Sequence, residues 1–287
     1  MPTPQPLTTR ADRDAARRQR RRRSIMISSA STIIVLGGIT TLVLTSPGWH
    51  TVRVTFFSWA WFHHSIGTVA KGFWLDVKVF LIVEAVVLVL GLALALIRTL
   101  DAPVLLPLKL LAIVWADLFR GVPSIMVVYM VGFGLPALDL TGVPTSASVL
   151  GGIALTLCYT AYVSEVYRAG IMSVHPSQGG AALALGLTRP QALRYVVLPQ
   201  AIRRVLPPLL NDFISLQKDV ALISILGGAS EAFRSAQIFA ASDFNYTPLV
   251  AAALLYLCVT IPLTRFVDRL QLRQLREQGG ALAMGPH

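Results

Sequence analysis

Long, largely apolar stretches alternate along the chain with short polar connections. The first occupies residues 25–45, and the others lie at about 77–97, 103–138, 149–171, 206–226 and 248–266. An α-helix rises about 1.5 Å per residue and a bilayer core is about 30 Å thick, so each stretch is long enough to cross a membrane. The pattern predicts an all-α polytopic membrane helix bundle with six transmembrane helices.

The stretch at 103–138 is too long for one straight span. Arg120, Gly121, Val122 and Pro123 follow one another in its middle. Proline removes a backbone hydrogen-bond donor and glycine loosens a helix, so we expect a break here. The segment before the break is then an interfacial or tilted helix, and the segment after it is the span proper.

Composition supports a membrane protein and excludes an ordinary soluble domain. Hydrophobic residues make up 54% of the 287, charged residues only 14%, and the mean hydropathy is +0.65. The net charge of +11 does not predict nucleic-acid binding, because the bases gather in loops, where they face anionic lipid. Cys158 and Cys258 lie in apolar stretches and predict buried free thiols; we expect no disulfide and no metal site.

The basic residues also predict an orientation. If the arginine run at 17–23 is cytoplasmic, nearly all loop bases fall on the same side. These are Arg98, Lys109, Arg168, Arg189, Arg194, Arg203, Arg204 and the bases of 265–276. The opposite side then has only Arg53, Lys71 and Arg234. By the positive-inside rule, this multi-pass protein has both termini in the cytoplasm.

The segments outside the spans differ in composition. Residues 1–24 predict a disordered basic cytoplasmic tail, and 25–45 an uncleaved transmembrane anchor, since no small-residue cleavage site follows. Residues 46–73 are rich in tryptophan and phenylalanine and predict a non-cytoplasmic interfacial segment. Residues 74–267 form the main transmembrane domain, with a cytoplasmic loop at about 172–200, and 268–287 form a cytoplasmic tail.

That cytoplasmic loop is built unusually well for a connection between spans. It includes "AALALGLTRPQALRYVVLPQA", residues 181–201. The alanine-rich part predicts a short helix ended by Gly186 near the C′ position, and Pro190 begins the next helical turn. Spacing alone favours an ordinary helical hairpin.

Several motifs in order resemble one transporter family. "FRGVPS" (119–124) and "AYVSEVYRAGI" (161–171) precede the loop, and "LPPLLNDFISLQKD" (206–219) follows it. The stretch from about 72 to 266 closely resembles permease subunits of polar amino acid importers in the ATP-binding-cassette superfamily, the histidine, glutamate, glutamine, arginine and opine type. The family's loop has the pattern Glu-Ala-Ala-x-x-x-Gly and, further on, Leu-Pro. The matching residues here are Ala181, Ala182, Gly186, Leu198 and Pro199.

The resemblance implies a type I importer fold with a five-helix core, to which 25–45 adds an extra helix. It implies the membrane-spanning permease subunit of an importer for a polar amino acid, glutamate- or glutamine-like or basic, in a bacterial inner membrane. The implied partners are ATPase subunits, a second permease subunit and an extracytoplasmic amino-acid-binding protein. The chain is then no enzyme and binds no cofactor. It has no G-x-x-x-x-G-K-[ST] motif, so ATP and Mg²⁺ are used by the partner ATPase.

The resemblance also assigns ATPase coupling to the loop helix. The residues concerned are Gly180, Ala181, Ala182, Leu185, Gly186 and Leu187. Gly180 replaces the family's glutamate and follows Gly179, and each glycine weakens a helix by about 1 kcal/mol relative to alanine. We expect these glycines to weaken the helix start, and expect a heterodimer whose second permease carries the intact triplet. A homodimer remains open.

Acidic residues inside the spans indicate where substrate binds, because charge at membrane depth is otherwise expensive. Asp212 and Asp219 are seven residues apart, on one helical face and about 10 Å apart along it. The resemblance implies that they line the substrate pocket, together with Asn211. The alternative is that Asp219 pairs only with Lys218 or with Arg120.

Two further charged residues are candidates for the same pocket. Glu84 lies within the second span and faces either the pocket or a base from another helix. Arg120 could hold a carboxylate in fork geometry or act as an anchor at the lipid surface.

Two other functions compete with an ATP-driven importer. An ion-coupled secondary amino acid transporter could use Glu84, Asp212 and Asp219 as proton or sodium sites, but it gives the cytoplasmic loop no task. A non-transporting scaffold does not explain the intramembrane acids. The sequence does not identify the transported amino acid.

Overall fold

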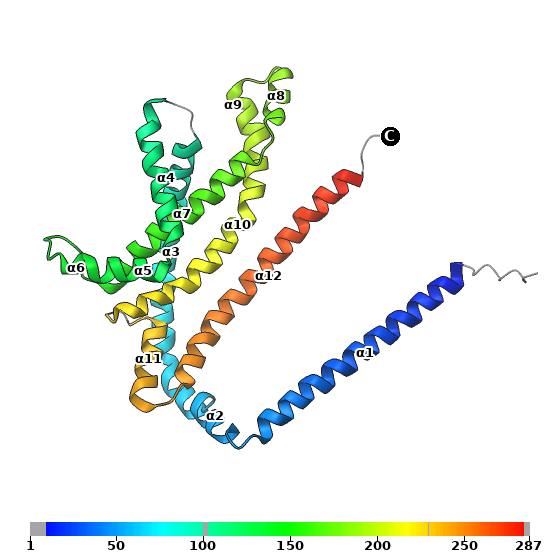
Figure 1. Cartoon of the computed structure of the whole chain (residues 1–287), viewed down its shortest axis with the longest axis vertical. Helices are drawn as coiled ribbons and strands as arrows, with labels where there is room; N and C mark the ends of the chain where they lie inside the picture. The colour runs from blue at the N-terminus through cyan, green and yellow to red at the C-terminus, as the bar shows by residue number, and fades with distance from the viewer. Residues whose placement is uncertain (1–9, 100–102, 229, 284–287) are drawn as a thin grey trace, which may run out of the picture. The chain divides into compact units, whose positions relative to one another are not determined.

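The computed structural model describes residues 10–99, 103–228 and 230–283, and it is entirely helical in regular structure within these ranges (Figure 1). The chain divides after Phe57 into two compact units. The first contains α1 (Arg10–Thr45) and α2 (Trp49–Phe56). The second contains α3 (Trp59–Thr99), η1 (Pro103–Leu105), α4 (Leu106–Gly121), α5 (Ser124–Tyr129), η2 (Met130–Gly134), α6 (Leu135–Ala137), α7 (Ala147–Met172), α8 (Pro176–Ala184), α9 (Arg189–Ala192), η3 (Leu193–Val197), α10 (Leu198–Asp219), η4 (Val220–Leu226), α11 (Ala232–Asp243) and α12 (Thr247–Ala283).

Helix α1 corrects one prediction about the N-terminus. It begins at Arg10, so residues 10–24 are helical, although they were expected to be disordered; residues 1–9 lie outside the described part. Arginine and alanine are good helix formers, and these residues run without a break into the apolar anchor, so they extend its helix. Inside the anchor, the Thr32 and Thr41 hydroxyls each donate to the carbonyl four residues back, at 2.8 Å. These bonds pair the threonine hydroxyls, which lipid chains could not hydrogen-bond.

Four helical segments in the described ranges are long and apolar enough to cross a membrane, and a bent pair could be a fifth. The four lie in α1, in the long helix ending at Thr99, in α7 and in α12. The bent pair is 103–121 with 124–137, at an angle of 105°. The break predicted at Gly121–Pro123 is therefore confirmed. Helix α10 is absent from this set, because its arginines, aspartates and glutamine lower its hydropathy, so the predicted count of six is not reached.

Helices α3 and α7 form the centre of the second unit. Gly152 lies opposite Val83, and Gly91 lies opposite Val163, so the two helices run in the same direction. A Cβ atom at Gly91 would come within 2.7 Å of Val163 Cγ1, so only glycine permits this close approach. The surrounding core includes Leu155 and Cys158, both fully buried, as well as Leu216 and Ile223 from α10 and η4.

The two cysteines differ from one another. Both are free, as predicted, and Cys158 is buried. Cys258 is exposed, so its predicted burial is wrong. It lies on α12, where an apolar run does not imply burial, because lipid is as apolar a neighbour as another helix.

Two carboxylates stabilise the start of α11: Asp76 joins it to α3 and α12, and Glu231 caps it. Asp76 Oδ2 accepts hydrogen bonds from the Ala232 amide at 3.2 Å and the Tyr256 hydroxyl at 2.8 Å. Glu231 accepts from the amides of the next turn, at 2.9 and 2.8 Å. Burial raises the pKa of Glu231 from 4.5 to about 7, and the Asp76 charge adds to the rise. Gly72 lets the backbones meet, since a Cβ there would lie 2.5 Å from the Glu231 carbonyl carbon.

Candidate functional site

Acidic side chains from α3 and α10 meet beside tyrosines of α7. The Tyr159 hydroxyl donates to Asp219 Oδ2 at 2.8 Å. Glu84 is only 7% exposed and lies within electrostatic range of Asp212. Asp212 Oδ2 is buried and has no hydrogen-bond partner in the part of the chain that the structure describes. Since Tyr159 also interacts electrostatically with both aspartates, the three carboxylates form one group, which we call the acidic cluster.

Packing of α10 against its neighbours fixes the acidic cluster. Phe213, next to Asp212, packs edge-on against Phe80 of α3, one turn from Glu84, with ring centres 4.6 Å apart. One turn further along α10, Gln217 Oε1 accepts from the Thr260 hydroxyl of α12 at 2.9 Å. The spacing of seven residues puts Asp212 and Asp219 on one face, so α10 presents both to α7.

The structure decides between some of the predicted pairings. Asp219 bonds to Tyr159; among the described residues it forms no ion pair with Lys218, which lies only within electrostatic range. The pairing of Asp219 with Arg120 is wrong, because Arg120 pairs with Glu165. Glu84 does not pair with a base in the described ranges and lies within electrostatic range of Asp212 instead. Asn211 is exposed, so the structure does not bring it into the acidic cluster.

The acidic cluster is suited to bind a cationic group. When ionised, the three carboxylates carry more negative charge than the neighbouring Lys218 can balance, and buried unpaired charge is unfavourable. A cationic group, such as an ammonium or guanidinium, would satisfy both the charge and the free acceptor atom of Asp212. The described ranges contain no set of three or more metal-ligating side chains placed for a metal ion.

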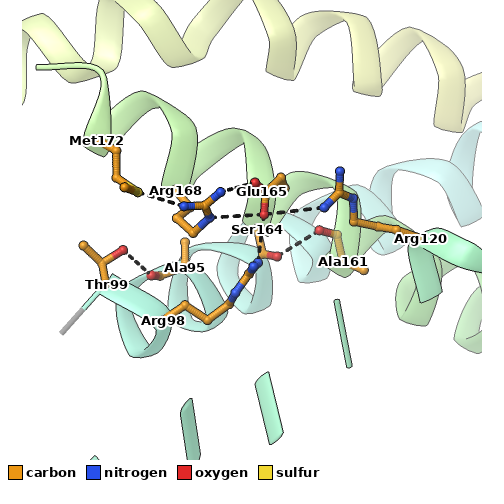
Figure 2. Close-up of polar contacts among 9 residues, drawn as sticks. All are labelled: Ala95, Arg98, Thr99, Arg120, Ala161, Ser164, Glu165, Arg168 and Met172. Carbon is orange, nitrogen blue, oxygen red and sulfur yellow. Dashed lines mark hydrogen bonds and ion pairs between the residues drawn. The ribbon is translucent and has the colours of Figure 1, made fainter. Parts of the chain in front are cut away.

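A second charged group surrounds Glu165 and joins three helices, as Figure 2 shows. Arg98 Nη1 of α3 lies 3.0 Å from Glu165 Oε2, and Arg120 Nη1 of α4 lies 3.6 Å from the same oxygen. Arg168, one turn further along α7, donates from Nε to Oε2 at 3.2 Å and from Nη2 to Oε1. We call these four residues the arginine cluster.

The sequence interpretation missed Tyr159 as a partner and Glu165 as the centre of a cluster. Glu165 and Arg168 are three residues apart, which is ion-pair spacing on a helix and was a usable signal. Tyr159 gave no such signal, because its partner is 60 residues away. In the sequence interpretation, Arg98 served only to predict the orientation of the chain in the membrane.

The loop between α7 and α10 contains the predicted short helix, shifted in position. Helix α8 begins at Pro176, and His175 Nδ1 caps it by accepting from the Ser177 amide at 3.2 Å. Gly186 ends it with φ +89°, a left-handed conformation, so the predicted C-terminal role of Gly186 is confirmed. Gly179 and Gly180 lie inside α8, and the prediction that they weaken its start is wrong. Proline at the first helical position supplies that start.

The side chains of this loop differ sharply in exposure. Leu185, at the end of α8, is 83% exposed, which is unusual for a leucine next to a helix. Ala182 is only 3% exposed and therefore packs within the chain. Gly180 is exposed, and a Cβ atom there would meet nothing within 4 Å. Leu185 is thus the most exposed leucine at this end of α8, followed by Leu183 at 43%.

Comparison with known proteins identifies relatives over most of the chain. Residues 89–276 match the family model described as "Binding-protein-dependent transport system inner membrane component". The probable glutamine ABC transporter permease protein GlnM of Bacillus subtilis is 33% identical over 64% of this chain and 83% of its own length. The arginine transport system permease protein ArtQ of the same organism is 31% identical over 72% of this chain and 92% of its own length.

Solved structures agree with this similarity. The crystal structure of an amino acid ABC transporter with histidines has a chain that is 30% identical, with a TM-score of 0.64, over 72% of this chain and 94% of that one. An inward-facing form of the MetNI methionine ABC transporter matches with a TM-score of 0.55 at 18% identity, covering 70% of this chain and 94% of that one. Because the identity of the second match is only 18%, it shows a shared fold and nothing more.

Proposed function

Since the chain belongs to the family of binding-protein-dependent transport system inner membrane components, we propose that it carries a polar amino acid of the glutamine or arginine type. It is the non-catalytic membrane permease of an ATP-binding-cassette importer, and a separate subunit hydrolyses ATP. The observation that carries the cargo proposal is the acidic cluster, because an amino acid brings the ammonium group that the cluster lacks.

The proposed substrate contacts are Glu84, Asp212 and Asp219. Asp212 has the free buried oxygen, and Glu84 lies beside it with no base of its own among the described residues. Asp219 is held by Tyr159, so it can add negative charge to the site without moving. Asn211 remains a predicted contributor through its position next to Asp212, and Arg120 remains one for the substrate carboxylate, although its described contact is Glu165.

The proposed topology has six spans, with α10 as the sixth and both termini in the cytoplasm. The distribution of arginine and lysine supports this orientation. It places α8 and α9, which join α7 to α10, on the cytoplasmic side (Figure 1). There α8 docks into the ATPase through Leu185 and its neighbours, so that ATP-driven closure moves α7 and α10. The proposed assembly also includes a second permease, preferably a different chain, and an extracytoplasmic binding protein.

Transport in a reconstituted system tests the proposal. The full chain, its ATPase and its second permease are placed in proteoliposomes with the binding protein outside. Uptake of labelled glutamine and arginine is then measured with internal ATP and no ion gradient. We expect uptake of one of them that stops when ATP is replaced by a non-hydrolysable analogue. Uptake driven by a sodium or proton gradient without ATP would instead support the secondary transporter.

A further inference from the structure

The arginine cluster carries more positive charge than its one acid balances. Three guanidinium groups, those of Arg98, Arg120 and Arg168, surround the single carboxylate of Glu165, which leaves a net charge of +2. Asp117 on α4 is exposed and forms no ion pair within the described ranges. Asp101 lies outside those ranges, and counting it would still leave the cluster positive. The group therefore has two positive charges that no acid in the described part of the chain pairs with.

One donor of the cluster is already buried without a partner. The Arg98 side chain is 10% exposed, and its Nε atom has no hydrogen-bond partner in the part of the chain described. A buried donor left unsatisfied is unfavourable by about 1–3 kcal/mol. Arg120 and Arg168 are 41% and 29% exposed, so a ligand can reach their guanidinium groups. Arg168 Nη1 donates to the Met172 sulfur at 2.8 Å, a weak acceptor that a ligand oxygen could replace.

The cluster lies where the spans end. Arg98 is one residue before the end of α3, and Arg168 is four residues before the end of α7. Because the two helices run in the same direction, both ends reach the same membrane surface, which is the cytoplasmic one in the orientation proposed above. Exposed apolar side chains accompany the arginines on the three helices: Leu96 (45%), Leu118 (53%) and Met172 (64%).

We propose that Arg98, Arg120 and Arg168 bind a phosphate group, supplied by an anionic phospholipid headgroup or as free phosphate. The planar guanidinium matches two phosphate oxygens at once, and charge-assisted bonds of this kind are strong. Glu165 contacts all three guanidinium groups, as Figure 2 shows, and so orients them. It also accepts some of their N–H donors, which are then not available to a phosphate. Basic sites between helices near the cytoplasmic surface suit such headgroups.

Lipid binding to the purified full chain in detergent tests the site. Phosphatidylglycerol, phosphatidylcholine with the same acyl chains, and inorganic phosphate are added separately. Lipid retention is measured by native mass spectrometry and thermal stability by tryptophan fluorescence. We expect phosphatidylglycerol to bind and stabilise the protein, and phosphatidylcholine to do neither. Inorganic phosphate that displaces phosphatidylglycerol and stabilises equally well identifies free phosphate as the source; failure to displace it identifies the lipid.

Arg120→Gln should weaken phosphatidylglycerol binding about tenfold, because it removes one charge-assisted contact. Arg203→Gln is the matched control: it removes the same charge from an exposed residue outside the cluster and should change nothing. Glu165→Gln should act in the opposite direction and tighten binding severalfold, because it frees guanidinium donors; a purely structural cluster would not respond so. If Glu165→Gln does not fold, the comparison of Arg120→Gln with Arg203→Gln still tests the phosphate site.

Three results would overturn the inference. Equal binding of the two lipids to the wild type is one, and equal effects of Arg120→Gln and Arg203→Gln are another. Displacement of phosphatidylglycerol by L-glutamine or L-arginine is the third, because it would assign the arginines to the substrate carboxylate. The assay needs neither ATP nor transport, so its failure is distinct from failure of the proposed function.

Discussion

The hydroxyl of Tyr159, in the middle of α7, donates a hydrogen bond to the Oδ2 atom of Asp219 at the end of α10, 2.8 Å away. This bond joins the two helices that the loop containing α8 and α9 connects. It also satisfies a carboxylate that would otherwise be unpaired in the bundle. A movement that separates α7 from α10 at this point would therefore break this bond.

Tyr159→Phe keeps the ring and removes the donor. We expect the free energy of unfolding to fall by about 1–3 kcal/mol, since Asp219 loses its partner. Tyr162→Phe is the control, because its ring packs against Tyr159 and the described part of the chain shows no hydrogen bond for its hydroxyl. In a cycle with Asp219→Asn, the two changes should be less than additive in the thermal melts. Full additivity would mean that the bond does not contribute.

Docking of the ATPase is best tested at Leu185. Leu185→Glu places a charge on an 83% exposed position, so the fold should persist while co-purification of the ATPase is lost. Gln178→Glu adds the same charge to another exposed position of α8 and is the control. Ala182→Asp is a poor test, because Ala182 is buried and the change would disturb packing first. Normal ATPase binding by Leu185→Glu would exclude this end of α8 from the interface.

Gly180→Glu should be tolerated. The position is exposed, and an added Cβ meets nothing within 4 Å, so a side chain has room; replacing glycine inside a helix should raise stability by up to about 1 kcal/mol. We expect unchanged uptake or modestly tighter ATPase association, measured in the reconstituted assembly. Gly180→Ala separates the backbone effect from the carboxylate. Complete loss of uptake with Glu but not with Ala would show that this permease requires position 180 to be without a carboxylate.

The buried Glu231 gives stability a pH dependence. Its pKa is about 7 in the folded protein against 4.5 ordinarily, so between these values the folded state binds the proton and the unfolded state does not. Stability should therefore fall as pH rises through this window. Glu231→Gln removes the titration, and the slope of melting temperature against pH should become shallower. An unchanged slope would assign the dependence to other groups.

The sequence predicted the helices of this protein better than their contacts. The break at Pro123 and the helix end at Gly186 were predictable, because proline and a left-handed glycine act locally. The start of α8 was misplaced by several residues, because the family pattern drew attention to Ala181 rather than to Pro176. Exposure of Cys258 was missed, because apolar runs in a membrane chain do not distinguish lipid from core.

Pairings between distant side chains were the least predictable part of the site. Asp212 and Asp219 were candidates from the sequence because acids in apolar stretches are rare and their spacing is helical. Their neighbours Tyr159 and Glu84 depend on how α3, α7 and α10 pack, and that packing is set by close approaches such as Gly91 against Val163. The same holds for Glu165, whose partners come from three helices.

Asp212→Asn tests the substrate site most directly. It preserves the shape of the side chain and removes the charge, and a hydrogen bond to a charged group contributes about 1.5–3 kcal/mol, so apparent affinity should fall roughly ten- to a hundredfold. Insertion and ATPase binding should be unchanged, since Asp212 contacts neither the loop nor Tyr159 through a hydrogen bond among the described residues. The measurement is the substrate dependence of ATP-driven uptake.

Asp243→Asn, a change at an exposed acid on α11, is the matched control and should leave the affinity unaltered. Glu84→Gln should lower the affinity as well, because Glu84 lies beside Asp212 and adds to the negative charge that a cation meets there. Since the two carboxylates repel one another when no cation is bound, removing either charge should also stabilise the empty protein. Unchanged affinity in Asp212→Asn with reduced affinity in Glu84→Gln would move the site from α10 to α3. Unchanged affinity in both would exclude the acidic cluster as the substrate site.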